Sequence, residues 1–490
     1  MLVVLLIFLT VSGIATFLAA TSKAAEQPGA GQIYGGITIA VFGVVALLAL
    51  LGWNDTSAFY GVLKSSRLSN IGVVLMCLIG GLVTAGVMAN PDKYRAGVGE
   101  FFGFVIFTVL GGILMIATDN LLVLLLGLEL SSYSTYILVG YYRDDRYSNE
   151  AASKYFLLGA VASGFLVFGM SFVYGGLAFA VSSNSPVSLN YADIGAVLAQ
   201  SATGIPPLMY PGLALMLVGF GFKLALVPFH SWTPDAYQGS PSMVAALLSV
   251  GPKAAVAIAL TSLLTTAFPM TGIAPAWQQA LAWMAILSMT IGNLQAIQQR
   301  NVKRLLGYSS IAQLGYVVIG IAVGSSQGTA ALVLYMIGYA ITNIGAFTVI
   351  AALRDAGVND DIEDYAGLVK RSPVSGILMV GFFMGLAGVP FLAGFLGKLL
   401  LLKSAVDGGL ILLAVIAALN IVPSYYYYFR VIIQAIFAEP KDSRTFELNP
   451  TAVTALSVAL IGVVFLGVYP TPVLEAINQA VKVLPMFAAR

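Results

Sequence analysis

Long apolar segments separated by short polar connections make up almost the whole chain. Fourteen segments can be counted, at roughly 1–21, 31–53, 70–90, 98–117, 120–141, 152–181, 206–230, 241–264, 275–298, 305–323, 328–353, 373–402, 409–436 and 450–470. Most are about 20 residues long, which is the length at which an α-helix spans a bilayer. An outer-membrane barrel would instead show short alternating strands. The pattern therefore predicts an all-α polytopic membrane protein with about fourteen transmembrane helices.

The composition supports this fold class and argues against several functions. Hydrophobic residues make up 59% of the 490 positions and charged residues 9%, whereas soluble domains carry roughly 25% charged residues. The formal net charge of +2 gives no reason to expect a nucleic-acid partner. One cysteine, Cys77, and one histidine, His230, supply almost no ligands for iron–sulfur, haem or zinc sites. We therefore expect no metal or cofactor in this chain, and any electron transfer would take place in another subunit.

Lysines and arginines are distributed unevenly between the two ends of the predicted bundle. If the segments alternate in direction, odd-numbered connections hold fifteen of these residues, and even-numbered connections and the termini hold five. In membrane proteins the cytoplasmic connections carry this excess. The bias predicts that both termini are non-cytoplasmic, in a bacterial or archaeal plasma membrane or in a thylakoid or organelle inner membrane.

Four charged residues lie well inside apolar segments. They are three lysines, Lys223, Lys253 and Lys398, and one carboxylate, Glu129 in LLVLLLGLELSSYSTY. A charge at the bilayer centre costs about 2.5–3.5 kcal/mol on insertion scales, so such residues persist mostly where they are used or paired. Glu129 is placed deep enough to pair with Lys223. These four residues are therefore candidates for an ion-translocating site.

Two of the segments contain a proline that should break the helix. Pro228 follows Lys223 by five residues, and Pro390 precedes Lys398 by eight. Proline removes a backbone donor and clashes with the preceding turn. Broken helices within a membrane are tolerated where they line a cavity buried in protein or filled with water. We expect such water-lined gaps beside both prolines.

Counting the segments also predicts an internal symmetry. Segments four to eight and nine to thirteen form two groups of five, each with one broken segment. An odd number of helices per repeat gives the two repeats opposite orientations. The predicted division is 1–97 for the first three helices, 98–264 and 275–436 for two inverted repeats, and 449–490 for the last helix and tail.

Three stretches resemble a known family. FKLALVPFHSWTPDAYQGSPSMVAALLSVGPKAA, GLELSSYSTYILVGYYRDDRYSNEAASKYFLLGA and NVKRLLGYSSIAQLGYVVIG are similar to the N subunit of respiratory complex I, called B in the photosynthetic version. The resemblance covers roughly residues 98–440. WTPDAYQGSP followed by LLSVGPKAA points to the N subunit, whereas sister subunits and Na⁺/H⁺ antiporter relatives usually read LPDA with other continuations.

The resemblance implies a fold, a site and partners. The fold is a fourteen-helix antiporter-like bundle with inverted five-helix repeats and two discontinuous helices. The site is a proton relay of Glu129, Lys223, Lys253 and Lys398. The chain departs from some relatives at Gln313, where they have a histidine, so a direct proton-carrying role there is doubtful. The partners are an antiporter-like sister subunit, small membrane subunits and lipids in a hetero-oligomer. Quinone, FMN and iron–sulfur clusters are implied in partner subunits only.

The pair Glu129–Lys223 can be understood in two ways. Opposite charges about 4 Å apart interact by about 4 kcal/mol at an effective dielectric of about 20, which corresponds to about three pKa units. A change in their separation would therefore load and unload a proton. The alternative is a static buried ion pair that fixes helix packing. Two other functions also stay open: a subunit of a cation/proton antiporter or membrane-bound hydrogenase, and a mainly structural spacer of the membrane arm.

Three other features have simpler explanations. Glu150 and Lys154, four residues apart, should form a pair on a helix surface. Lys303 and its basic neighbours are expected at the cytoplasmic face because topology alone explains them. The run of tyrosines at 425–428 is expected to mark an aromatic interface belt or packing rather than a quinone site.

His230 is a further candidate for the proton path, because it lies seven residues after Lys223 and would connect that lysine to the cytoplasm. The alternative places it at the membrane interface, hydrogen-bonded near Trp232 and Asp235.

Overall fold

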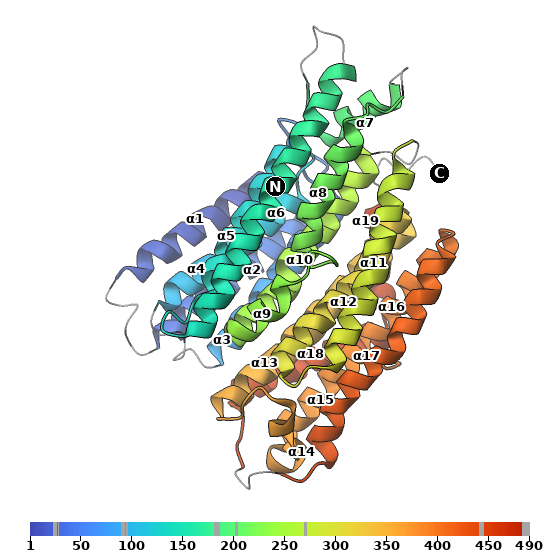
Figure 1. Ribbon diagram of the computed structural model, residues 1–490. Coiled ribbons are helices and arrows are strands. Elements are labelled where there is room, and N and C mark those ends of the chain that lie inside the picture. Colours follow the sequence, from blue (N-terminus) through green and yellow to red (C-terminus); the bar gives the residue numbers. More distant parts are fainter. Residues whose placement is uncertain are drawn as a thin grey trace.

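The computed structural model describes residues 1–482 except 23–26, 28, 90–93, 95–96, 181–186, 201–203, 269–271 and 441–444. Within these residues the chain forms a bundle of long helices that run side by side (Figure 1). Six of the basic residues used to predict the orientation lie outside the described residues: Lys23, Lys93, Arg95, Lys441, Arg444 and Arg490.

The predicted segments correspond to helices one by one. Eleven helices of the described chain are long and apolar enough to span a membrane: α1 (Leu2–Ala20), α2 (Ala30–Leu51), α3 (Arg67–Met88), α4 (Val98–Ile116), α5 (Leu121–Val139), α6 (Arg146–Ala180), α10 (Ser242–Ala267), α11 (Ala274–Ile297), α12 (Val302–Val323), α13 (Ser326–Asp355) and α17 (Ile411–Phe437). Three more predicted segments are broken or bent: α8 (Met209–Lys223) with α9 (Trp232–Gly239), α15 (Pro373–Ala387) with α16 (Ala393–Asp407), and α18 (Pro450–Val468), which meets α19 (Thr471–Lys482) at 71°.

Several short elements were not predicted from the sequence. They are a two-stranded antiparallel hairpin of β1 (Ala58–Phe59) and β2 (Leu63–Lys64), and the helix α7 (Tyr191–Gln200). The polar connection at 354–372 also contains a 3₁₀ turn at Ile362–Tyr365 and the short helix α14 (Leu368–Arg371). All of them lie in connections between the long helices. They are too short, or too little periodic, to stand out beside the long apolar segments.

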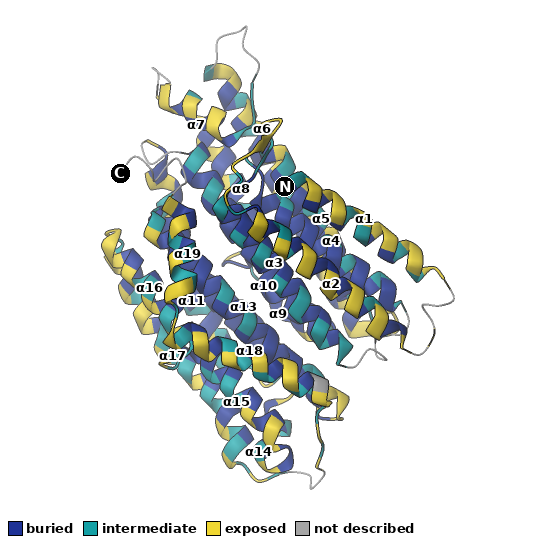
Figure 2. Cartoon of the chain, turned by 180° about the vertical axis from the view of Figure 1, so that it is seen from behind, coloured by how far each residue is buried: buried dark blue, intermediate teal, exposed yellow. Residues whose placement is uncertain are grey.

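The centre of the bundle is formed by α10, α12 and α13. In the apolar stretch of α10 all residues are buried, and in that of α12 94% are. The outer helices expose apolar side chains instead, so that buried residues fill the interior and exposed ones lie along the rim (Figure 2). Leu126 in α5 and Val422 in α17 are 64% and 70% exposed. This distribution is the one expected for helices whose outer surface faces lipid or neighbouring subunits rather than water.

Close packing of α4 on α5 sets the position of the glutamate singled out above. A Cβ atom on Gly111 of α4 would lie 2.6 Å from the carbonyl oxygen of Gly127 in α5. Only a glycine permits this approach of two backbones, as at many helix crossings in membranes. The N-terminus of α5 is fixed as well, because the Asn120 side chain accepts hydrogen bonds from Leu122 and Val123. Glu129 therefore sits on a helix whose depth and rotation are both determined.

The odd-numbered connections meet at one end of the bundle, as the alternating topology requires. Asp235 in the first turn of α9 binds Lys154 of α6 at 3.0 Å and Arg304 of α12 at 2.6 Å. At the opposite end, Lys64 of the hairpin binds Asp119 between α4 and α5 at 3.2 Å. These contacts confirm that the odd-numbered connections lie together at one end of the bundle. The side of the membrane on which each end lies stays a prediction.

Both predicted helix breaks are present. Residues 224–231 separate α8 from α9, and Trp232 Nε1 donates to the carbonyl of Phe222 across the gap at 3.0 Å. Residues 388–392 separate α15 from α16, with Gly388 in the left-handed region at φ 86°. The prolines at 228 and 390 lie inside these gaps. The inverted relation of the two repeats and the boundaries given above stay predictions.

Candidate functional site

Lys223 is the last residue of α8 and sits at the first break. Its side chain is only 4% exposed. Nζ donates a hydrogen bond of 2.9 Å to the hydroxyl of Tyr136 on α5. The rings of Tyr136, Phe222 and Tyr155 lie 4.9, 5.5 and 5.8 Å from the same nitrogen. Aromatic faces attract a cation, so this buried ammonium group is held by one hydroxyl and three rings.

Glu129 does not touch Lys223, and the predicted direct pair is therefore wrong for this conformation. Among the described residues, no acidic oxygen lies within ion-pair distance of Lys223 Nζ. Glu129 instead accepts a hydrogen bond of 2.5 Å from Ser163 on α6. Tyr136, seven residues after Glu129, is two turns further along the same face of α5 and takes its place beside the lysine.

A cavity of about 530 Å³ lies between α5 and α6, and Glu129 is part of its wall. Tyr133, Tyr136 and Ser163 are other polar residues of this wall. Tyr133 is 54% exposed at the outer surface of the bundle. The carboxylate is thus half-buried at the flank of the bundle, with room on one side of it.

Lys253, in the central helix α10, is the second buried lysine. Nζ donates to the hydroxyls of Tyr237 at 3.0 Å and Ser310 at 2.6 Å. It also lies 5.8 Å from the ring centre of Trp232, which stacks on Tyr155 at 4.4 Å. Since Tyr155 also faces Lys223, two stacked aromatic rings separate the first and second lysines.

Lys398 occupies the second break. It is 3% exposed on α16, and Nζ donates to the carbonyl oxygens of Leu386 and Ala387 at 3.3 and 3.2 Å. These carbonyls belong to the last turn of α15, where helix carbonyls lack partners within the helix and carry partial negative charge. The ring centre of Tyr316 lies 5.3 Å from Nζ. The break therefore creates the acceptors that bind the third lysine.

Gln313, the residue at which the chain departs from some relatives, lies beside Lys398. Its Nε2 donates to the carbonyl of Leu386 at 3.2 Å, the same oxygen that Lys398 binds. It also donates to the hydroxyl of Tyr428 at 3.1 Å, while Tyr335 donates to Oε1. The amide is thus fixed by three partners at the junction between the central helices and the second break.

The tyrosine run at 425–428 contributes packing rather than an exposed belt. Tyr427 and Tyr428 are fully buried, and Tyr427 donates to Asn293 on α11 at 3.1 Å. Tyr426 alone of the run is strongly exposed, at 59%. The expectation that these tyrosines serve packing is confirmed. Tyr428 also belongs to the polar cluster around Gln313.

His230 does not make the hydrogen bonds expected for it. Trp232 binds the carbonyl of Phe222, and Asp235 binds Lys154 and Arg304. Nδ1 of His230 is buried and has no hydrogen-bond partner among the described residues. The histidine is half-buried inside the first break, and its part in a proton path stays a prediction. The pair Glu150–Lys154, in contrast, is confirmed at 2.8 Å.

Sequence reasoning expected Lys303 at the cytoplasmic face on topology alone and missed its burial. Its side chain is completely buried, and Nζ donates to the carbonyls of Gln238 and Ser240 at 3.2 and 2.6 Å. It thereby caps the C-terminal end of α9. A signal was present in the helical period: Lys303 precedes Ser310, the partner of Lys253, by seven residues and so lies on the same face of α12.

A polar cavity of about 370 Å³ opens at the end of the bundle where the odd-numbered connections meet. Its wall carries acidic, basic and tyrosine side chains: Tyr142, Asp145, Tyr147, Glu150, Lys154, Asp235, Arg304, Arg354 and Asp360. In the part of the chain that the structure describes, no three His, Cys, Asp or Glu side chains are grouped as metal ligands would be.

The sequence of the chain is similar to those of known membrane proteins. Residues 118–422 match the family described as NADH:quinone oxidoreductase/Mrp antiporter, TM. The chain is 39% identical over 454 residues to NADH-quinone oxidoreductase subunit N of Trichlorobacter lovleyi, covering 91% of this chain and 90% of the relative. It is 37% identical over 464 residues to the subunit N of Chloroflexus aggregans, covering 93% and 92%.

Solved structures show the same likeness. A chain of respiratory complex I from Thermus thermophilus with bound aureothin is 32% identical, with a TM-score of 0.80 and coverage of 96% of this chain and 99% of that chain. A chain of the Mrp complex from Dietzia sp. DQ12-45-1b is 18% identical with a TM-score of 0.84, covering 99% and 97%, which is a likeness of fold alone.

Proposed function

Because the chain belongs to the NADH:quinone oxidoreductase/Mrp antiporter family, and within it to the N subunits of NADH-quinone oxidoreductase, we propose that it carries protons across the membrane. It is an antiporter-like subunit of the membrane arm of complex I, where it works beside other membrane subunits. The observation that supports proton transport is the series of three buried lysines, called the lysine line below: Lys223, Lys253 and Lys398. None of them contacts a carboxylate within the described residues.

The first step of the proposal concerns Lys223. Its ammonium group is held by the Tyr136 hydroxyl and aromatic faces, while Glu129 stands off and binds Ser163. Approach of the carboxylate to about 4 Å would favour the protonated amine by about 4 kcal/mol at an effective dielectric of about 20. Withdrawal would release the proton. The switch proposed from the sequence thus becomes a movement of Glu129 between Ser163 and the lysine.

Lys253 and Lys398 receive the proton in turn. A buried ion without an opposite charge is unfavourable, and a lysine in such surroundings can give up its proton and become neutral. Lys253 is held by two hydroxyls and Lys398 by two carbonyls, so both sites accept a charged or a neutral amine without breaking an ion pair. Proton transfer along the line would then be driven by charge changes next to each lysine.

The remaining parts of the proposal concern the surroundings of the chain. Electron transfer through FMN, iron–sulfur clusters and quinone would take place in partner subunits. Membrane lipids would contact the exposed apolar rim. Both termini would face away from the cytoplasm, in a bacterial or archaeal plasma membrane. An antiporter or hydrogenase role has weaker support because the likeness to the Mrp chain is one of fold alone. A purely structural role would leave the three unpaired buried lysines without explanation.

The test uses the assembled complex in proteoliposomes. Lys223→Ala, Lys253→Ala and Lys398→Ala should each assemble, as judged by native gels, and should lose proton uptake together with coupled NADH oxidation. Lys403→Ala is the matched control because Lys403 lies on the same helix as Lys398 but is exposed. Full proton uptake by the three assembled variants would refute proton transport through this chain.

A further inference from the structure

We propose that Asn293 of α11 is a positioning residue for Lys398, because it bridges an interior proline of α17 and thereby fixes two tyrosines that hold the second break. Asn293 is completely buried, and the proline is Pro423. The inference deepens the proposed function and rests on it, because the position of Lys398 matters for turnover only if this lysine binds and releases protons.

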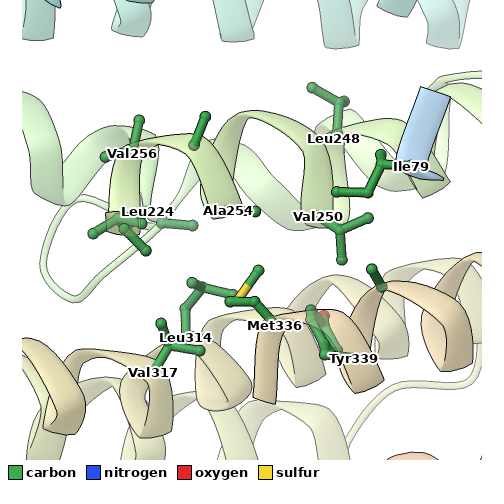
Figure 3. Close-up of a cluster of buried hydrophobic side chains, with 14 of the residues drawn as sticks. Ile79, Leu224, Leu248, Val250, Ala254, Val256, Leu314, Val317, Met336 and Tyr339 are labelled. Atoms are coloured by element: carbon green, nitrogen blue, oxygen red, sulfur yellow. The ribbon is translucent and has the colours of Figure 1, made fainter. Parts of the chain in front are cut away.

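The contact between α11 and α17 differs from the packing at the centre of the bundle. Figure 3 shows an apolar layer there, in which Val250 of α10 faces Met336 of α13. Between α11 and α17, in contrast, the side chains of Asn293 and Asn420 are hydrogen-bonded to each other. Within a membrane, such polar side chains bond across helices or replace missing backbone partners. Apolar packing therefore does not account for this contact.

Pro423 leaves a backbone carbonyl of α17 without its helix donor. A proline inside a helix has no N–H for the carbonyl four residues earlier, and its ring clashes with that carbonyl. Asn420 belongs to this turn, three residues before the proline. Nδ2 of Asn293 donates to the backbone oxygen of Asn420 at 2.8 Å and to its Oδ1 at 3.1 Å. The neighbouring helix thus supplies a donor to the turn in which the proline removes one.

The same amide also binds the turn after the proline. Its Oδ1 accepts a hydrogen bond of 3.1 Å from Tyr427, which lies seven residues after Asn420 and so on the same face of α17. Further along, Arg430 donates to the carbonyl of Ile297 at the end of α11 at 2.9 Å. Asn293 therefore joins the two halves of α17, whereas Arg430 holds the second half alone.

The second half of α17 carries the tyrosines that hold the second break. Tyr425 donates to the carbonyl of Gly388 at 2.9 Å. Gly388 directly follows the last turn of α15, whose carbonyls bind Lys398. Tyr428 accepts a hydrogen bond from Gln313, which binds the same turn. A rotation of this half of α17 would therefore move the hydrogen-bond acceptors of Lys398.

The bridge requires an amide because an amide has a donor end and an acceptor end. The donor end of Asn293 faces two oxygens of Asn420, and the acceptor end faces the hydroxyl of Tyr427. Without this side chain, Arg430 would still hold the second half of α17 on α11. The helix would stay docked, but the rotation of its second half relative to the first would no longer be fixed.

The decisive variant is Asn293→Leu, which keeps the size of the side chain and removes both hydrogen bonds. The assay is NADH oxidation coupled to proton uptake in proteoliposomes, measured across a pH series. We expect an assembled complex whose turnover at neutral pH is lowered about ten-fold and whose pH profile moves about one unit to lower pH. Misplaced carbonyls would bind the ammonium group less well, so that Lys398 would need a higher proton concentration.

A merely structural role of Asn293 predicts a different result. The melting temperature of the Asn293→Leu complex would fall, and the pH profile would stay in place. An unshifted profile in the assembled variant would therefore overturn the inference.

Thr290→Val is the matched control. Thr290 lies on α11 three residues before Asn293, and its hydroxyl accepts a hydrogen bond of 3.2 Å from the Asn420 side chain. Valine has the shape of threonine, so this variant removes one bond of the same cluster and leaves the bridge across Pro423 in place. It should keep the wild-type pH profile. A shift equal to that of Asn293→Leu would overturn the inference, because the bridge would then not be the cause.

A double variant covers the case in which Asn293→Leu does not assemble. Adding Pro423→Ala restores the backbone N–H that the proline lacks, so the double variant should assemble. Failure of this variant as well would show that Asn293 is needed for a reason unrelated to the proline, and would overturn the inference.

Lys398→Ala, measured in parallel, separates the two proposals. Full proton uptake by the assembled Lys398→Ala complex refutes the proposed function itself. Loss of uptake in Lys398→Ala beside an unshifted pH profile in Asn293→Leu refutes the Asn293 inference alone.

Discussion

Removing the hydroxyl of Tyr136 should change the pH dependence of turnover. This oxygen is the one hydrogen-bond acceptor that Lys223 Nζ has among the described residues, at 2.9 Å. A hydrogen bond to a charged group is worth about 1.5–3 kcal/mol, and the aromatic rings that remain offer no lone pair. Tyr136→Phe should therefore destabilise the protonated form of Lys223 by about 1.5–3 kcal/mol, or roughly ten- to a hundred-fold in its proton affinity.

The direction of the pH shift follows from the lower proton affinity of Lys223 in this variant. If Lys223 must bind a proton in each cycle, a lower proton affinity has to be offset by a higher proton concentration. The variant should therefore turn over slowly near neutral pH and recover as the pH is lowered, by about one to two pH units relative to the wild type. The assay is NADH oxidation coupled to proton uptake in proteoliposomes, measured across a pH series on complex of verified assembly.

Tyr210→Phe provides the control. Tyr210 lies on α8, the helix that carries Lys223, and its side chain is 46% exposed. Its variant should keep the wild-type pH profile. If Lys223 were only a packing element, Tyr136→Phe would lower thermal stability and leave the pH profile in place. An unshifted profile in a fully assembled Tyr136→Phe complex would refute the reasoning.

Two further predictions concern lysines. Lys223→Arg should assemble but fail to pump, because arginine keeps its proton at any useful pH; pumping above about a tenth of the wild-type rate would contradict a protonation cycle at this position. Lys303→Met should lower the stability of the complex by about 1–3 kcal/mol, because it leaves the carbonyls of Gln238 and Ser240 buried without a donor. A thermal melt measures this loss, with Lys370→Met as the exposed control, and an unchanged melting temperature would show that the cap is dispensable.

Much of the fold follows from the sequence because the bilayer imposes a simple length rule. Each apolar segment of about 20 residues became a helix or a broken pair, and Pro228 and Pro390 marked both breaks. The three lysines could be singled out for the same reason, since an amine in an apolar segment is costly wherever its helix is placed. Helices can be predicted from length and hydrophobicity without knowing which helices are in contact.

The partners of those lysines could not be predicted, because they depend on how helices rotate and slide against one another. Glu129 and Tyr136 lie on the same face of α5, and only the axial offset between α5 and α8 decides which one meets Lys223. The burial of Lys303 depends on a close approach as well: a Cβ on Gly307 would lie 3.0 Å from Cα of Pro234, so that α9 covers the start of α12. Such offsets arise from packing of the whole bundle.

Lys223 and Lys398 are held by different kinds of hydrogen-bond acceptor. Lys398 binds backbone carbonyls at the end of α15, which cannot titrate and whose dipole is fixed by the helix. Lys223 binds a side-chain hydroxyl, and the nearby carboxylate of Glu129 binds Ser163 instead of the lysine. In the proposed relay, a change of hydrogen-bond partner by Glu129 would therefore act on Lys223 and would leave the acceptors of Lys398 unchanged.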